Sequence, residues 1–412
     1  MKKVIHTHDL SCGSVLLMEP DDAVASTSMR WLLPAGSSHD PDEQVGVSAM
    51  LEELIFRGAG DMDSRALSES LDRHGLQRHT DISVHHLEIA STCTGNELPE
   101  AIRLIGLIVR NPALPRESME SSRSLCIQAL ESLKDDPRQE VMIKLKGLHR
   151  PSPMNRSGYG ERSMLENLRH EEVRDAWRAG CVPGGCIISL AGRLDPKETI
   201  EIFEQVLDGW TGHAGSPAPS KAAPGGTHHE MRDSNQVHIG AAWHAPSRSH
   251  PDAPVERMAM RILSGTSSGR LFTEVRQKRS LCYSVGARYQ PGRDQGTISL
   301  YAGTTPERAQ ETLDVCLQEF ERMGAGVTSE EFERARTSLE SAIVLGGEST
   351  RARSAALAGD YFTIGRTRSM EELLEEVRGI TLQRLNEYLE SRLLAPPTIV
   401  TFGPASLEVP VS

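Results

Sequence analysis

The residues best suited to chemistry lie in three places along this sequence. Glu52 and Glu53 are adjacent, Glu131 follows later, and Arg276 and Tyr283 belong to a polar stretch of the second half. Carboxylates can act as general bases or ligate a metal ion. A guanidinium and a phenol donate hydrogen bonds, and stabilising an oxyanion requires preorganised donors. The sequence therefore offers an acidic group and a donor pair, and each has a purely structural alternative.

The acidic pair lies on a predicted amphipathic helix at residues 46–58. Glu53 and Arg57 are spaced to form an i,i+4 ion pair on a polar face. The apolar residues share another face at helical spacing, and they are Val47, Met50, Leu51, Leu54 and Ile55. From this pattern alone, the glutamates belong to solvated faces of a surface helix.

The donor pair lies in a predicted helix and strand at residues 263–285. We expect Ser267 or Ser268 to cap the helix. Its inward residues are Leu271, Phe272 and Val275, and in the strand Leu281, Tyr283 and Val285 share one face. From the pattern alone, Arg276 is an ion-paired helix residue and Tyr283 lines the core.

The elements that carry these residues recur in the same order in both halves of the chain. Strands at 87–92 and 298–302 each lead into two helices, which start at 97 and 115 in the first half and at 305 and 328 in the second. Further strands at 186–190 and 398–402 close the halves. A Gly-, Pro- and Ser-rich linker at 213–229 divides them. We expect two homologous α+β domains, 1–212 and 230–412, each a mainly antiparallel sheet with helices packed on one face.

Composition excludes several classes of protein. The 412 residues carry a net charge of -12, which argues against a nucleic-acid partner. No apolar run reaches the length of about 20 residues that a membrane span needs. The start of the chain lacks the apolar segment of a signal peptide. The seven cysteines are scattered without a CxxC pair, which favours reduced thiols and a cytoplasmic location.

Residues 46–58 resemble the signature Gly-Leu-x-His-x-x-Glu-His-x-x-Phe-x-Gly of the pitrilysin/insulinase family, the inverted zincins that include mitochondrial-processing-peptidase-like proteins. Residues 33–40 are similar to the segment that precedes this signature. In the family, the two histidines bind zinc and the glutamate activates a metal-bound water. Ala49 and Glu53 occupy the two ligand positions here, and Glu52 occupies the position of the general base.

The third zinc ligand of the family is a Glu on a later helix, which residues 123–131 resemble. Without gaps, its position falls on Ala129, and Glu131 points to a different helix face. Carboxylates alone would make a weak, unselective zinc site. Adjacent strand residues such as His85-His86 and His228-His229 point to opposite faces. The resemblance therefore implies no metal site in this chain, and the solvated glutamates and an altered site remain the two alternatives.

Residues 267–285 resemble the family's C-terminal motif, Ser-Ser-Arg-Leu-Phe-x-Glu-(Val/Ile)-Arg-x-Lys-Arg-x-Leu-x-Tyr-Ser-Val. In family members an Arg and a Tyr of this motif hold the substrate backbone and stabilise the oxyanion, and the matching positions are Arg276 and Tyr283. Residues 75–81 depart from the family, because they are shorter and lack the Asn-Ala of the edge strand that pairs with substrate.

The resemblance implies a non-catalytic subunit of a heterodimeric zinc metallopeptidase. Such a subunit encloses a peptide or unfolded protein and lends Arg276 and Tyr283 to the zinc site of a paralogous partner. It would hold no cofactor itself, because the zinc is expected in the partner. Two alternatives remain: a structural or peptide-binding homodimer without a proteolytic role, and a peptidase with an altered metal site.

Overall fold

The computed structural model describes residues 4–218, 221–392 and 394–409. Pro219 and Ser220 of the expected linker, and residues 1–3, lie outside this range. The chain divides into two compact units, and each takes segments from both halves of the sequence. The first unit consists of Met1–Ser132, Ser152–Lys221 and Gly346–Ser369, and the second of Leu133–Pro151, Ala222–Leu345 and Met370–Ser412. The compact units therefore differ from the contiguous halves 1–212 and 230–412. Leu133–Pro151 of the first half belongs to the second unit, and Gly346–Ser369 of the second half belongs to the first unit.

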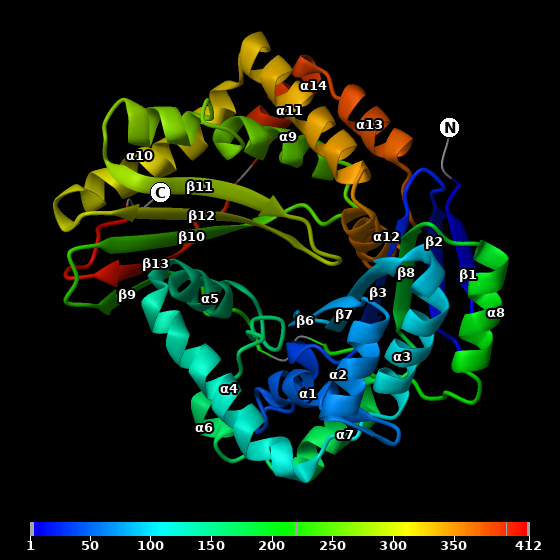
Figure 1. Cartoon of the computed structure of the whole chain (residues 1–412). Coiled ribbons are helices and arrows are strands. Elements are labelled where there is room, and N and C mark those ends of the chain that lie inside the picture. The colour runs from blue at the N-terminus through cyan, green and yellow to red at the C-terminus, as the bar shows by residue number, and fades with distance from the viewer. Residues whose placement is uncertain (1–3, 219–220, 393, 410–412) are drawn as a thin grey trace. The chain divides into compact units, whose positions relative to one another are not determined.

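The first unit is built on a six-stranded sheet with the order β1-β2-β8-β3-β7-β6 (Figure 1). Only the β2–β8 pair is parallel. The strands are β1 (His6–Asp9), β2 (Val15–Pro20), β3 (Ser26–Leu33), β6 (Gln77–Ile82), β7 (Leu87–Thr94) and β8 (Ile187–Gly192), with a separate small ribbon of β4 (Gly58–Ala59) and β5 (Met62–Asp63). The helices are α1 (Val47–Ile55), α2 (Ser64–Arg73), α3 (Leu98–Arg110), α4 (Met119–Ser132), α6 (Arg162–Leu165), α7 (His170–Gly180), α8 (Pro196–Val206) and α12 (Thr350–Ile364).

Both faces of this sheet are covered. On one face Trp31 of β3 meets Phe203 of α8, with ring centroids 5.8 Å apart, and both side chains are fully buried. On the other face α12, which comes from the second half of the chain, packs Leu357 and Ala358 against the sheet. Its Arg353 makes a bidentate ion pair with Glu19 of β2, and both charges are buried. The helix is therefore tied to the sheet by apolar contact and by charge.

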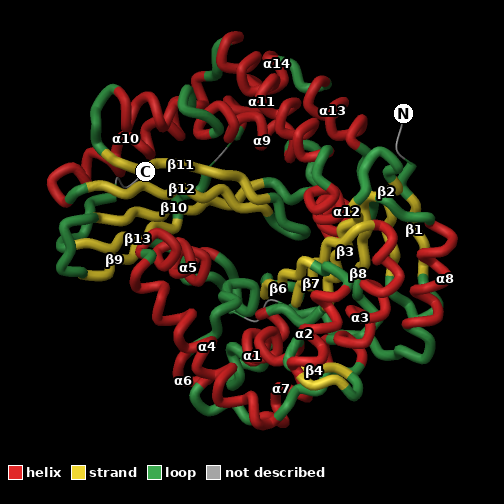
Figure 2. The backbone as a smooth tube through the Cα atoms, viewed as in Figure 1, coloured by secondary structure: helices red, strands yellow, loops and turns green. Residues whose placement is uncertain are grey.

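The second unit is built on a five-stranded sheet with the order β11-β12-β10-β13-β9. Only the β13–β9 pair is parallel. Figure 2 shows that helices and strands form separate layers in this unit. The strands are β9 (Thr227–Met231), β10 (Val237–Ala245), β11 (Cys282–Gln290), β12 (Gly296–Thr304) and β13 (Thr398–Gly403). The helices are α5 (Pro137–His149), α9 (Ala253–Ser264), α10 (Ala309–Arg322), α11 (Ser329–Gly347), α13 (Met370–Arg378) and α14 (Leu382–Ser391), with a π-helical turn at Phe272–Gln277.

The second sheet is also covered on both faces. Trp243 of β10 stacks on Phe320 of α10, with ring centroids 4.3 Å apart. The opposite face receives α5, which comes from the first half of the chain and packs Val141 and Leu145 against Val400 and Phe402. The burial of such large apolar side chains contributes about 1.5–3 kcal/mol each to stability.

The two units repeat one plan. Read from its opposite edge, the first sheet runs β6-β7-β3-β8-β2, which matches β11-β12-β10-β13-β9 in both order and strand direction. Each sheet then carries one helix donated by the other half of the sequence, α12 in the first unit and α5 in the second. The expected fold of two related α+β units is confirmed, and the exchanged helices add a layer that we did not expect.

The segment between the halves contains no helix among its described residues, but its last part is not a linker. Strand β9 begins at Thr227, so His228 and His229 pair with β13.

All seven cysteines are free thiols. Within the described ranges, none of the helices has the length and apolar character that a membrane span requires.

Candidate functional site

Helix α1, which carries the first group of candidate residues, is positioned by its N-terminal end. Asp40 accepts hydrogen bonds from the N–H groups of Gly46 and Ser48, at 2.7 and 3.2 Å. Gly46 has φ = 111°, a conformation that favours glycine. Burial raises the pKa of Asp40 to about 6, although these hydrogen bonds oppose the shift. The apolar face of α1 is buried as predicted.

The residues at the family's zinc-ligand positions on α1 differ in their surroundings. Ala49 is buried with 7% of its surface exposed, whereas Glu52 and Glu53 are partly exposed. Glu53 pairs with Arg57 at 3.7 Å, as its spacing predicts. Burial raises the pKa of Glu52, a hydrogen bond with Thr80 opposes the shift, and the charges of Asp81 and Glu53 add to it. Glu52 therefore lies beside strand β6, in an acidic and partly desolvated position.

Helix α4, where the third ligand position was expected, presents a different residue to α1. Ala129 lies on the exposed face of α4, and the exposed Glu131 pairs with Arg162. Cys126 is buried, and its pKa rises to about 12 because of burial and then because of the charges of Glu53 and Glu52. Cys126, three residues before the position given by the ungapped comparison, thus lies close enough to Glu53 and Glu52 for their charges to act on it.

The paired histidines serve structural contacts. The rings of His85 and His86 lie 5.0 and 4.5 Å from the ring of Phe362. His228 contacts the Gly225 carbonyl at 2.6 Å, and His229 contacts the Thr401 hydroxyl at 2.9 Å. Among the residues that the structure describes, no group of three or more His, Cys, Asp or Glu side chains is arranged to hold a metal ion.

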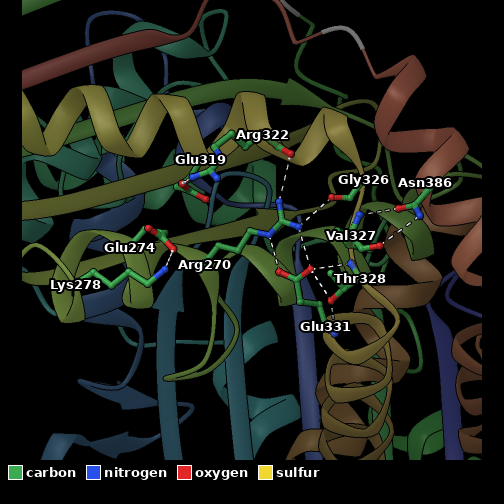
Figure 3. A network of polar contacts seen from close by, with 10 residues as sticks. All are labelled: Arg270, Glu274, Lys278, Glu319, Arg322, Gly326, Val327, Thr328, Glu331 and Asn386. Atoms are coloured by element: carbon green, nitrogen blue, oxygen red, sulfur yellow. Dashed lines mark hydrogen bonds and ion pairs between the residues drawn. The ribbon is translucent and has the colours of Figure 1, made fainter.

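Arg270, the first arginine of the second motif, is held by ion-pair and hydrogen-bond contacts (Figure 3). Arg270 makes a bidentate ion pair with Glu331, at 2.7 and 3.0 Å, and also donates to the Gly326 carbonyl at 3.0 Å. Glu331 and Thr328 form a capping box at the start of α11, the helix expected to start at 328. Burial alone would raise the pKa of Glu331, but Arg270 and Thr328 outweigh it and lower the pKa to about 2. Arg270 therefore anchors the motif to α11.

The other cations of the motif differ in whether they form an ion pair. Lys278 and Arg279 both bind the Glu274 side chain, at 2.6 and 2.8 Å. Arg276 is exposed and stacks over the Phe272 ring, with 5.0 Å between the guanidinium carbon and the ring centroid. It makes no ion pair within the described part of the chain. The alternative of an ion-paired helix residue is therefore wrong for Arg276, and its donors are available.

Tyr283 does not line the core either. A β-bulge interrupts the pairing of β11 with β12, where Cys282 pairs with Thr304 and Ser284 with Gly303. The extra residue turns Tyr283 away from the core side that Leu281 and Val285 face, so the expected shared face is wrong for Tyr283. Tyr283 is 48% exposed, and its hydroxyl donates to Gln236 at 2.9 Å.

Three residues that the sequence did not single out position this phenol. Tyr301 of β12 interacts with the Tyr283 hydroxyl, and its own hydroxyl lies 2.9 Å from His238. Burial and then Tyr283 raise the pKa of Tyr301. Gly303 lies beneath both hydroxyls, and Gln236 accepts from Tyr283. These contacts cross between strands, so no spacing along the sequence indicates them.

Comparison with known proteins agrees with these features. The family description "Insulinase (Peptidase family M16)" matches residues 16–152, and "Peptidase M16 inactive domain" matches residues 167–339. Similar proteins include an uncharacterized zinc protease of Mycobacterium bovis, 23% identical over 88% of this chain and 85% of that protein, and one of Rickettsia bellii, 22% identical over 99% of each.

Solved structures show the same fold at low sequence identity. A peptidase M16 inactive domain from Pseudomonas fluorescens has a TM-score of 0.88 at 19% identity, covering 99% of this chain and 100% of that one. A protease from Helicobacter pylori has a TM-score of 0.87 at 14% identity, covering 98% and 100%. A chain of Complex III2 from Candida albicans has a TM-score of 0.81 at 17% identity, covering 97% and 96%. This protein belongs to the insulinase family of peptidases, M16.

Proposed function

We propose that this protein is a non-catalytic subunit of a heterodimeric zinc peptidase. It helps to enclose a peptide or unfolded substrate and presents Arg276 and Tyr283 to the zinc site of a paralogous partner. The observation that carries the proposal is the state of these two side chains. They are the exposed donors of a motif whose other cations, Arg270, Lys278 and Arg279, are held in ion pairs.

The first motif supports the same division of labour. Ala49 has no donor atom, and Glu53 is paired with Arg57. Glu52 occupies the position of the general base, but a general base of this kind needs a metal-bound water to activate. Helix α1 therefore keeps the frame of a catalytic helix, while the chemistry is assigned to the partner.

The chemistry of the donor pair suits an oxyanion. A guanidinium and a phenol can direct N–H and O–H groups at a carbonyl oxygen that gains negative charge. The phenol of Tyr283 has a single O–H, so its hydrogen must turn from Gln236 to the substrate oxygen. The bulge at Tyr283 and the stacking of Arg276 on Phe272 hold both groups in position. Removing one oxyanion donor typically lowers kcat by about 10²–10³-fold.

The test mixes this chain with a relative that carries an intact His-x-x-Glu-His helix and measures kcat/KM on an unstructured peptide. We expect Tyr283→Phe and Arg276→Ala each to lower kcat/KM by about 10²-fold, while sedimentation shows unchanged association. Arg279→Ala is the matched control, because it removes a paired cation of the same motif. If both variants leave the activity of the mixture unchanged, the proposed role is wrong.

A second candidate is a structural or peptide-binding protein without a proteolytic role, active as a homodimer. The likeness to a chain of Complex III2 favours it, since that chain is part of a larger assembly. This alternative predicts that adding this chain to a zinc-bearing relative does not raise the peptidase activity of that relative. It also predicts a single species of twice the chain mass in sedimentation of the protein alone.

A further inference from the structure

The second unit contains a cavity of about 260 Å³ that the proposed function does not use. It lies where the end of β10, the first turns of α9 and the C-terminal end of α14 come together. The lining residues are His244, Ala245, Pro246, Glu256, Tyr388, Arg392 and Leu394. A cavity of this volume is somewhat smaller than the pockets that hold drug-sized ligands, so it suits a small ligand.

The wall of this cavity is formed by a buried ion pair. Arg392, with 7% of its side chain exposed, donates from Nη1 to Oε1 of the fully buried Glu256 at 2.8 Å. The hydroxyl of Tyr388 donates to the other carboxylate oxygen. Burial and the charge of Glu256 raise the pKa of Tyr388, so this phenol stays a donor at neutral pH. Both oxygens of Glu256 are thus occupied.

Only one nitrogen of the Arg392 guanidinium, Nη1, donates a hydrogen bond among the described residues. Within the residues that the structure describes, neither Nε nor Nη2 of Arg392 has a hydrogen-bond partner. These two nitrogens form the fork that binds a carboxylate through two parallel N–H···O bonds. A charged guanidinium binds a carboxylate more strongly than it binds a neutral acceptor such as water, so an anionic group in the cavity gains affinity from these two donors.

The neighbours of Arg392 define the rest of the ligand. Ala245, Pro246 and Leu394 add apolar wall. Burial and then the charge of Arg150 lower the pKa of His244, so its imidazole is neutral at pH 7 and adds no charge. We propose that this cavity binds a carboxylate that carries a short apolar group, supplied by a small free acid or by the C-terminal end of a peptide.

The corresponding place in the first unit is closed. There the end of α7 meets the segment that follows β3, as the end of α14 meets the segment that follows β10. A Cβ added at Gly180 would lie 2.5 Å from the Cβ of Ala35, so these two segments are in close contact. The cavity is therefore a local feature of the second unit and no general gap in the repeated plan.

The test uses the full chain alone at pH 7, so its result does not depend on a peptidase partner. Calorimetry compares N-acetyl-leucine with N-acetyl-leucinamide, and acetyl-Ala-Ala-Leu with its C-terminal amide. We expect both acids to bind at least 10-fold more tightly than their amides. Tighter binding of the tripeptide acid than of N-acetyl-leucine assigns the site to peptide ends, and equal binding assigns it to small acids. Acids and amides of equal affinity, or no binding of either acid at millimolar concentration, would overturn the proposal.

Two variants locate the binding. Arg392→Lys keeps a charge opposite Glu256 but removes the fork, and we expect at least a 10-fold loss of affinity. Leu394→Trp fills the cavity without touching the ion pair, and we expect binding to be lost. The matched control is Leu345→Trp, since Leu345 is 66% exposed elsewhere in the unit. Thermal unfolding checks that each variant folds, and wild-type affinity in Leu394→Trp would rule the cavity out.

Discussion

The phenol of Tyr283 lies across the backbone of Gly303, so a Cβ at residue 303 would come within 2.5 Å of the Tyr283 hydroxyl oxygen. The β-bulge turns Tyr283 out of the core, and the missing side chain at Gly303 gives its ring a place to lie. The hydroxyl then reaches Gln236 and Tyr301. The orientation of this donor thus depends on a residue of the neighbouring strand.

Gly303→Ala therefore tests positioning without removing the phenol. The methyl group displaces the hydroxyl, and a misplaced donor loses much of its effect, so we expect kcat/KM of the mixed peptidase to fall by up to ~10²-fold. Gly286→Ala on β11 is the control, because its added Cβ meets only the Ser264 hydroxyl at 3.5 Å. Equal activity of the two variants would show that the position of Tyr283 is unimportant.

Glu331→Gln tests the anchor between the second motif and α11. The pKa of Glu331 is lowered to about 2, so its ionised form stabilises the fold above its ordinary pKa of 4.5, and this contribution is lost as the pH falls from 4.5 towards 2. The shift corresponds to at most ~3 kcal/mol, and partial solvent screening reduces it to about 1–2 kcal/mol. We expect the variant to be less stable by this amount in urea unfolding at pH 7, with a smaller difference at pH 3.5. Glu330→Gln, at an 83% exposed side chain, should change little at either pH.

Metal analysis tests the reading of the first motif. Ala49 offers no ligand, and among the described residues no group of three or more His, Cys, Asp or Glu side chains is arranged to hold a metal ion. We expect the purified chain to carry no stoichiometric zinc, and zinc or a chelator to leave its Tm unchanged. One bound ion per chain that is lost in Glu52→Gln or Glu53→Gln would instead support a peptidase with an altered metal site.

The Glu19–Arg353 pair tests how strongly α12 is fixed to the first sheet. Removing one partner leaves a buried charge unpaired, so we expect Glu19→Gln to lower the free energy of unfolding by about 3–5 kcal/mol. Replacing both residues with Met should cost clearly less, because no charge is then stranded. The exposed Arg65–Glu69 pair is the control, and Glu69→Gln should cost under about 1 kcal/mol. Equal losses in the single and double variants would contradict this account.

Local patterns in the sequence predicted the elements well. The apolar spacing in α1 predicted its buried face, and the helix expected from 328 begins at Ser329; the structure confirms both. The availability of Arg276 did not follow from spacing alone, because it depends on which cations Glu274 and Glu331 bind.

Other features depend on contacts that spacing cannot encode. Strict alternation along the strand predicted that the Tyr283 side chain faces the core. A bulge adds one residue to β11, so this side chain points to the opposite face. The ungapped comparison gives Ala129, which is exposed, and only the structure shows that Cys126, one turn earlier on α4, is buried and close to Glu52 and Glu53. The packing of α5 and α12 on the sheets depends on contacts between segments far apart in the sequence, so no local pattern indicates it.

The exchange of α5 and α12 has a consequence for the synthesis of the chain. The strands of the first sheet end at Gly192, but the helix that covers one of its faces starts only at Thr350. That face therefore stays bare while some 150 further residues leave the ribosome. During this interval Leu17, Leu32 and Ile187 are exposed to other chains, so we expect the nascent protein to need a chaperone or rapid completion. A gene cut at the linker would make this state permanent.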